Sequence, residues 1–160
     1  MKILLAIDDS KYGEEALRTL IAQARTKGTE VRVMHVIEEV RAYLSAEMMP
    51  HLVPYAAAVE QERERQAGAL VDRAAGKLRK AGFRVSEAVE RGDPKVHIID
   101  QAAKWGADLI VLGSHGWKGM NRFLMGSVSE AVARHAGCSV QIVRVRGAAA
   151  RRTKRRPARR

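Results

Sequence analysis

The chain has 160 residues, of which 46% are hydrophobic, so it is long enough for one domain with a sizeable core and too short for two ordinary domains. No apolar run approaches the roughly 20 residues of a membrane-spanning helix, and the first residues form a predicted strand instead of a cleavable leader. A single cysteine, Cys138, allows no intramolecular disulfide and is expected to be a packed thiol. These features predict a cytoplasmic protein that does not contact the membrane.

The net charge of +11 is concentrated at the end of the chain. Residues Gly147–Arg160 hold seven of the 29 basic residues and no acidic residue, which leaves 22 basic against 18 acidic residues in the preceding part. Without apolar periodicity, this segment buries too little surface to offset its ordering entropy. The sequence therefore predicts one domain over residues 1–146 and a disordered, arginine-rich tail over residues 147–160.

Strands and amphipathic helices alternate along the predicted domain. Short apolar runs indicate strands, and apolar residues at i, i+3 and i+4 indicate helices. In chain order these elements are a strand at Lys2–Ile7, a helix from Ser10, a strand at Val31–Ile37, a helix at Gln66–Lys80, a strand at Arg84–Glu90, a short helix from Pro94, a strand at Asp108–Leu112, a helix that begins at Gly126 and Ser127, and a strand at Val140–Val145. Such alternation predicts an α/β fold: a doubly wound, five-stranded parallel sheet with helices on both faces.

The segment Glu38–Glu60 lacks clean periodicity and follows the carboxyl end of the second strand. Long irregular segments are often functional. Three interpretations stay open: a lid over a site at the end of the sheet, a surface that packs on a partner subunit, or a mobile loop.

A glycine pattern follows the fourth strand. Gly113, Gly116, Gly126 and Ser127 form the spacing G-x2-G-x9-G-S, and the last two residues begin a helix. Ligands of open α/β sheets bind at the carboxyl ends of strands, and a helix amino terminus attracts anions. We therefore expect phosphate groups to accept hydrogen bonds from main-chain N–H groups at Gly113, Ser114, Gly116, Gly126, Ser127 and Val128. The alternative is that these glycines serve only turns and helix packing.

Three other side chains in this loop are ambiguous. The imidazole of His115 could meet a phosphate or face solvent, and Lys118 and Arg122 could neutralise phosphate charge or simply be solvated. The other four histidines show no pair spacing typical of a metal site, so no metal ligands are predicted.

Five separated segments resemble the ATP-binding branch of the universal stress protein family. Besides the glycine pattern, they are Lys2–Ser10, His35–Ile37, Gly92–Pro94 and Cys138–Arg144. The resemblance implies the strand order 3-2-1-4-5, which would bring Asp8 and Gly113 to one crevice. It also implies that Asp8 contacts the adenosine, that Ala6 and Ile7 lie along the base, that main chain around Val36 holds the adenine, and that Val140–Val145 forms a homodimer. Taken alone, Asp8 could instead cap the first helix, as could Asp9.

Several enzyme motifs are missing. The sequence has no Walker P-loop, no G-x-G-x-x-G after its first strand and no G-x-S-x-G nucleophile elbow, so no catalytic residue is predicted. The favoured function is an ATP-binding regulatory protein, with Mg²⁺ on the phosphates and at most slow ATP hydrolysis. One alternative is a protein that binds nucleic acid non-specifically through Arg151–Arg160. Another is an enzyme related to the adenine-nucleotide α-hydrolases, which share the architecture.

Overall fold

The computed structural model describes residues 1–39, 53–116 and 125–145. The predicted tail at 147–160 lies outside these ranges. Lys118 and Arg122 of the glycine loop, and residues 40–52 of the segment predicted to be irregular, lie outside them too.

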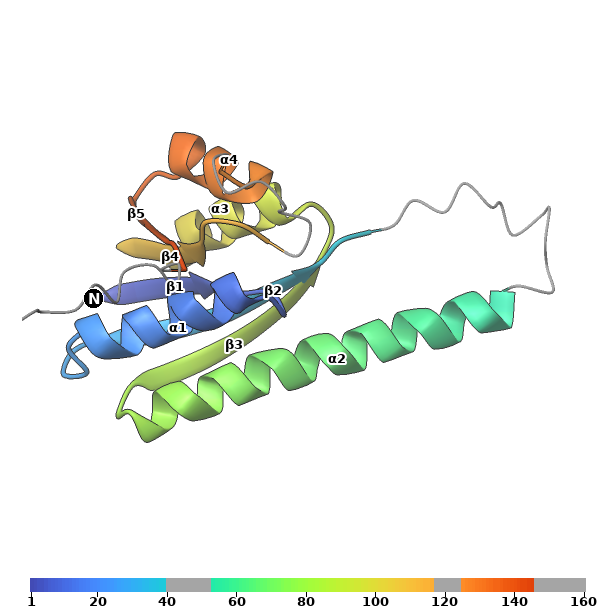
Figure 1. Ribbon diagram of the computed structural model, residues 1–160, viewed down its shortest axis with the longest axis horizontal. Helices are drawn as coiled ribbons and strands as arrows, with labels where there is room; N and C mark the ends of the chain where they lie inside the picture. Colours follow the sequence, from blue (N-terminus) through green and yellow to red (C-terminus); the bar gives the residue numbers. More distant parts are fainter. Residues whose placement is uncertain (40–52, 117–124, 146–160) are drawn as a thin grey trace, which may run out of the picture.

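Five parallel strands form a single sheet in the order β3-β2-β1-β4-β5, which confirms the predicted fold and strand order. The central strand pairs with β2 on one side and with β4 on the other, so the winding direction reverses between β1 and β4 (Figure 1). The strands are β1 (Lys2–Ala6), β2 (Glu30–Ile37), β3 (Arg84–Arg91), β4 (Leu109–Gly113) and β5 (Ser139–Val143).

Helices cover both faces of this sheet (Figure 1). Helices α1 (Lys11–Gln23) and α2 (Val53–Lys80) lie on one face, and α3 (Pro94–Trp105) and α4 (Ser127–His135) lie on the other. Successive residues of a strand point to opposite faces, so Leu5 packs under α1 and α2 while Leu4 packs under α3 and α4. Both leucines are fully buried, and this two-sided burial explains why the central strands are almost continuously apolar.

The second helix is longer than predicted. It begins at Val53 instead of Gln66, so the predicted irregular segment is helical over residues 53–60. No described residue of α2 before Ala67 is buried, because this part projects beyond the ends of the strands (Figure 1). Because this part of the helix does not pack on the core, it has no apolar stripe. Ion pairs between residues three apart, such as Arg65–Glu62, stabilise it instead.

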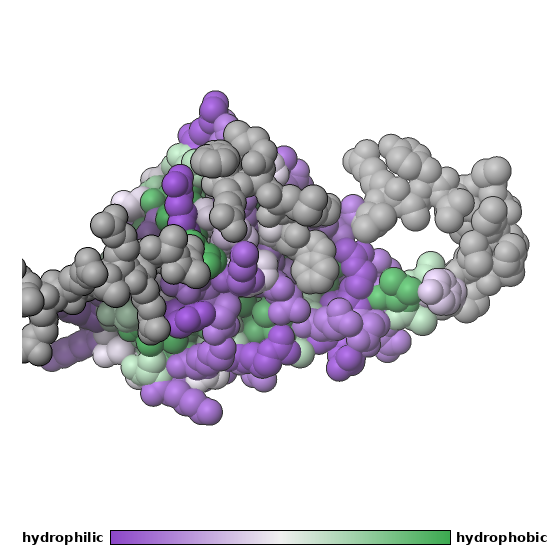
Figure 2. Space-filling view, viewed as in Figure 1, coloured by the Kyte–Doolittle hydropathy of each residue, from purple (hydrophilic) through white to green (hydrophobic). Residues whose placement is uncertain are grey.

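Hydrophilic residues cover most of the face shown in Figure 2, and apolar residues gather at the projecting end of α2. Tyr55 and Val59, near that end, are 73% and 42% exposed.

The last strand is also displaced from its prediction. Strand β5 spans Ser139–Val143, not Val140–Val145, because its partner β4 ends at Gly113, which is in register with Val143. The side chains of this strand alternate between the two faces of the sheet: Val140 packs towards α3 and α4, while Val143 packs towards α1 and α2. Within the described ranges, no helix combines the length and the apolar character needed to cross a membrane.

Candidate functional site

An open crevice of about 870 Å³ lies at the carboxyl ends of β1, β2 and β4. This is the point where the strand order reverses, and open α/β sheets bind ligands at such points. The structure brings ten of the eleven predicted site residues to its wall: Ala6, Ile7, Asp8, Val36, Gly113, His115, Gly116, Gly126, Ser127 and Val128. The eleventh, Ser114, is 2% exposed and does not belong to the wall.

The start of α1 fixes the carboxylate of Asp8. Ser10 is the N-cap, and its Oγ accepts hydrogen bonds from the N–H groups of Tyr12 and Gly13. The same hydroxyl donates to Oδ1 of Asp8 at 2.6 Å. Neither Asp8 nor Asp9 therefore fills the capping role that the sequence left open. Instead, a neighbouring hydroxyl orients the Asp8 carboxylate within the crevice.

The other oxygen of that carboxylate, Oδ2, faces the glycine loop. A Cβ atom placed on Gly116 would lie 3.0 Å from it, which is closer than a relaxed contact. The carboxylate of Asp8 and the main chain at Gly116 are thus immediate neighbours, although 108 positions separate them in the sequence. The strand order implied by the resemblance predicted that Asp8 and the start of the glycine loop lie in one crevice.

Two of the glycines have a packing role. A Cβ on Gly113 would lie 2.6 Å from Cβ of Tyr12 and 3.0 Å from its carbonyl oxygen, so this glycine lets α1 approach the end of β4. At Gly126, a Cβ would lie 3.2 Å from Cα of His115. The packing interpretation therefore explains Gly113 in full, and close approach of a ligand is not required to account for it.

Helix α4 presents its amino terminus to the crevice. Within the part of the chain that the structure describes, no side chain caps it, whereas Ser10 caps α1 and Asp93 caps α3. Its N-cap, Gly126, is held by a 2.9 Å hydrogen bond from its N–H to the carbonyl oxygen of Ser114. The main-chain N–H groups of a first turn and the helix dipole together favour an anion.

Ser129 locks this arrangement, and the sequence analysis missed it. Ser129 is 1% exposed, and its hydroxyl lies within hydrogen-bonding distance of the carbonyl oxygens of Ser114, at 3.0 Å, and Gly126, at 2.9 Å. It therefore ties the first turn of α4 to the end of β4. The sequence signal for this role was a serine three positions after Gly126, the glycine at which the helix begins.

His115 is held from two sides. Its Nδ1 lies 3.0 Å from Oγ of Ser114, and its ring centroid lies 5.0 Å from that of Tyr12 at an interplanar angle of 38°. His115 lines the crevice, and its ring packs against that of Tyr12. Tyr12 is a second residue that the sequence analysis missed.

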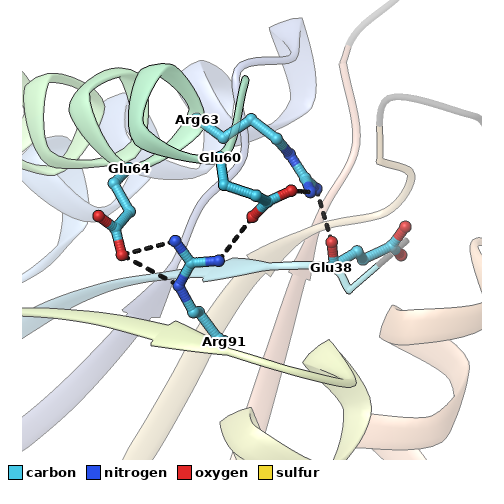
Figure 3. A network of polar contacts seen from close by, with 5 residues as sticks. All are labelled: Glu38, Glu60, Arg63, Glu64 and Arg91. Atoms are coloured by element: carbon cyan, nitrogen blue, oxygen red, sulfur yellow. Dashed lines mark hydrogen bonds and ion pairs between the residues drawn. The ribbon is translucent and has the colours of Figure 1, made fainter. Parts of the chain in front are cut away.

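Helix α2 supplies a polar wall, which was not predicted: the helix was expected to begin only at Gln66, and no site residue was assigned to it. Arg63, Arg65, Gln66 and Arg73 line the crevice. Figure 3 shows the network around Arg63: its guanidinium donates to Glu60 and to the carbonyl oxygen of Glu38, while Arg91 of β3 pairs with Glu60 and Glu64.

The hydrogen bonds of this network shift the pKa values of Glu60 and Arg91. Hydrogen bonds from Arg91, and then from Arg63, lower the pKa of Glu60, and the bonds to Glu64 and Glu60 raise the pKa of Arg91. A carboxylate whose pKa is lower in the folded protein contributes stability above its unfolded pKa, and that contribution is lost as the pH falls through the folded value.

We therefore expect the effect of Arg91→Gln on stability to depend on pH. At pH 7 the substitution lowers the melting temperature, since Glu60 and Glu64 lose their common partner. Below the ordinary carboxylate pKa of 4.5 the difference from the wild type shrinks, because protonated carboxyls no longer pair with Arg91. Melting curves of both proteins between pH 7 and pH 3 measure this, and a constant difference would contradict it.

Among the described residues, no three histidine, cysteine, aspartate or glutamate side chains are grouped so that they could hold a metal ion.

Comparison with known proteins gives one consistent result. A sequence model of the universal stress protein family matches residues 1–144. A putative universal stress protein of Staphylococcus epidermidis is 33% identical over 144 residues, which cover 89% of this chain and 82% of that protein.

Two solved structures extend the match to three dimensions. Hypothetical protein MJ0577, the subject of a structure-based assignment of biochemical function, has a TM-score of 0.77 and 27% identity, covering 91% of this chain and 96% of its own. The universal stress protein of Archaeoglobus fulgidus in complex with dAMP has a TM-score of 0.59 and 25% identity, covering 89% and 96%.

Proposed function

The chain belongs to the universal stress protein family, and from this premise we propose that its crevice binds an adenine nucleotide, with ATP as the expected ligand. The observation that carries the proposal is the pairing of two unlike groups across one crevice. The amino terminus of α4, which no described side chain caps, lies on one wall and the Asp8 carboxylate on another. The relative bound to dAMP supports the same ligand class.

These groups match the two ends of a nucleotide. An ionised carboxylate only accepts hydrogen bonds, so Asp8 suits ribose hydroxyls and disfavours phosphate. The N–H groups at Gly116, Ser127 and Val128 only donate, so they suit phosphate oxygens. The N–H of Gly126, which the sequence predicted as a further donor, is already bonded to the carbonyl oxygen of Ser114. Ala6, Ile7 and Val36 are each 8% exposed, and they give the base an apolar floor beside the main chain of β2.

Magnesium would enter with the phosphates. Mg²⁺ keeps several waters and is commonly bound through substrate phosphates and one or two protein oxygens. Ser127 lines the crevice, so its hydroxyl is the protein oxygen that we propose beside the phosphates.

We assign this binding a regulatory role in the cytoplasm, in which bound nucleotide changes the order of the loops and so the recognition of partners. Slow hydrolysis of ATP would be incidental, and pyrophosphate release with an added substrate would favour the enzyme alternative instead.

Thermal denaturation tests the proposal. A ligand at 100 times its dissociation constant stabilises the folded state by about 2.7 kcal/mol, so ATP with Mg²⁺ is expected to raise the melting temperature. Tripolyphosphate, which lacks the nucleoside, should raise it far less. Equal shifts from both ligands would indicate a plain anion site and contradict adenine-nucleotide binding.

The same proposal includes a homodimer. In the described sheet, β5 is an edge strand that pairs with β4 alone, and an unpaired edge can associate with another chain. The surface would be Ser139–Val143, within the predicted Val140–Val145 except at its first residue. A monomeric mass in solution would contradict it.

A second property is proposed from charge. The seven cations within Arg151–Arg160 would give non-specific, salt-dependent contact with nucleic acid. Truncation before Arg151 is expected to abolish retention on immobilised duplex DNA at low salt and to leave nucleotide affinity unchanged. Retention of the truncated protein with the same salt dependence would remove the tail from this account.

A further inference from the structure

Arg63 joins helix α2 to the end of β2, on the rim of the crevice. Its Nη2 donates a hydrogen bond to the carbonyl oxygen of Glu38, the first residue after β2, at 2.5 Å. Its Nη1 donates to Oε1 of Glu60, one turn earlier in α2, at 2.8 Å. The two bonds use different nitrogens of one rigid, planar fork, so the position of the carbonyl is fixed relative to the helix.

The network also connects α2 to β3. The other oxygen of Glu60, Oε2, accepts from Nη1 of Arg91 at 2.6 Å, and Nε of Arg91 donates to Glu64 at 3.1 Å. Arg91 ends β3 and is in register with Ile37, the last residue of β2. Figure 3 shows how the side chains of α2 and β3 converge beside the main-chain carbonyl of Glu38. Arg63 is 28% exposed, the least of the three paired residues Arg63, Glu60 and Arg91.

Polar contacts matter here because apolar burial is absent. The first buried residue described in α2 is Ala67, so the part of the helix that carries Glu60 and Arg63 is not anchored in the core. Several charges that act as a network contribute more than an isolated surface pair. The hydrogen bond from Arg63 therefore helps to hold the main chain at Glu38.

We propose that Arg63 is a positioning residue that fixes the main chain leaving β2 and thereby sets the base selectivity of the crevice. The inference rests on the proposed function, since it concerns the end of the crevice at Val36, where the base would lie. At the corresponding ring position adenine presents an amino donor and guanine presents a carbonyl acceptor. Main-chain groups held in one orientation can satisfy only one of these, and a site built for one pattern rejects the other.

Arg63→Gln tests this, with Arg79→Gln as the matched control. Arg79 also pairs α2 with β3, through Glu87, but it does not line the crevice. For each protein, calorimetry gives the affinities for ATP and GTP in the presence of Mg²⁺. We expect the preference of the wild type for ATP to fall by about tenfold or more in Arg63→Gln and to stay unchanged in Arg79→Gln.

A measurement without ligand tests the positioning step directly. The N–H of Gly92 donates to the carbonyl oxygen of Ile37 at 3.0 Å, so its hydrogen exchange reports whether the end of β2 stays in place. Arg63→Gln should accelerate this exchange and Arg79→Gln should not. Arg63→Lys keeps the charge but lacks the fork, so it should behave like the glutamine variant in both measurements.

Three results would overturn the inference. They are equal loss of ATP and GTP affinity in Arg63→Gln, recovery of the preference in Arg63→Lys, and unchanged exchange at Gly92. A wild type that binds ATP and GTP equally would also overturn it while leaving nucleotide binding intact. A wild type that binds neither would contradict the proposed function itself, and this is known before any variant is made.

Discussion

Gly113→Ala is expected to lower the free energy of unfolding by about 3 kcal/mol. The added methyl group would lie 2.6 Å from Cβ of Tyr12, and two of its three nearest neighbours are main-chain atoms of α1, at 2.9 and 3.0 Å. Main-chain atoms cannot rotate away, so α1 must move off the sheet, and overpacking of this kind typically costs about 1–3 kcal/mol or more. Urea denaturation of both proteins measures the difference.

Gly76→Ala is the matched control for this substitution. Gly76 lies inside α2, and a Cβ placed there meets no atom within 4 Å. Alanine is a better helix former than glycine, so this variant should be more stable than the wild type by about 0.5–1 kcal/mol. If Gly113→Ala were as stable as the wild type, the close packing of α1 on β4 would be refuted.

Asp8→Asn is expected to weaken ATP binding by about ten- to a hundredfold while the protein stays folded. Hydrogen bonds to a charged group contribute roughly 1.5–3 kcal/mol, and the amide that replaces the carboxylate has one acceptor oxygen instead of two. Asparagine has nearly the same shape, so the Ser10 hydroxyl can still donate to its remaining oxygen. Calorimetric titration with ATP and Mg²⁺ measures the affinity.

The neighbouring residue provides the control. Asp9→Asn changes the net charge by the same amount, but the Asp9 side chain is 76% exposed and lies 4.0 Å from Arg73. ATP affinity should then stay within about twofold of the wild type, because solvent and salt screen an exposed charge. Equal effects at both positions would mean that Asp8 acts through its charge alone and not as a ligand contact.

The predictable part of the fold was the part built on apolar burial. Buried strands and one-sided helices leave period-2 and period-3.6 patterns, so Val31–Ile37 was located almost to its ends. Strand order was not contained in those patterns, and it came from the resemblance of separated motifs. Residues 53–65 of α2 were missed because ion pairs stabilise them and no apolar face marks them.

The residues of the candidate site likewise fall into those with a local sequence signal and those without one. Strand ends and glycine spacing predicted the positions of Gly116 and Ser127, and the strand order implied by the resemblance predicted that of Asp8; all three line the crevice. Arg63 and Tyr12 were missed, since their contacts join segments that are far apart in the sequence and leave no local signal. At Gly113, the sequence could not distinguish a glycine that admits a ligand from one that admits Tyr12.

Calorimetric titration of ATP with Mg²⁺ into the wild type and into a Gly126→Val, Ser127→Ala double variant, at matched folded fractions, tests the central claim most directly. The double variant fills the space at the N-cap of α4 and removes the Ser127 hydroxyl, so saturable binding by the wild type should be lost. Absence of binding by the folded wild type, or equal binding by both proteins, would contradict a nucleotide site in this crevice.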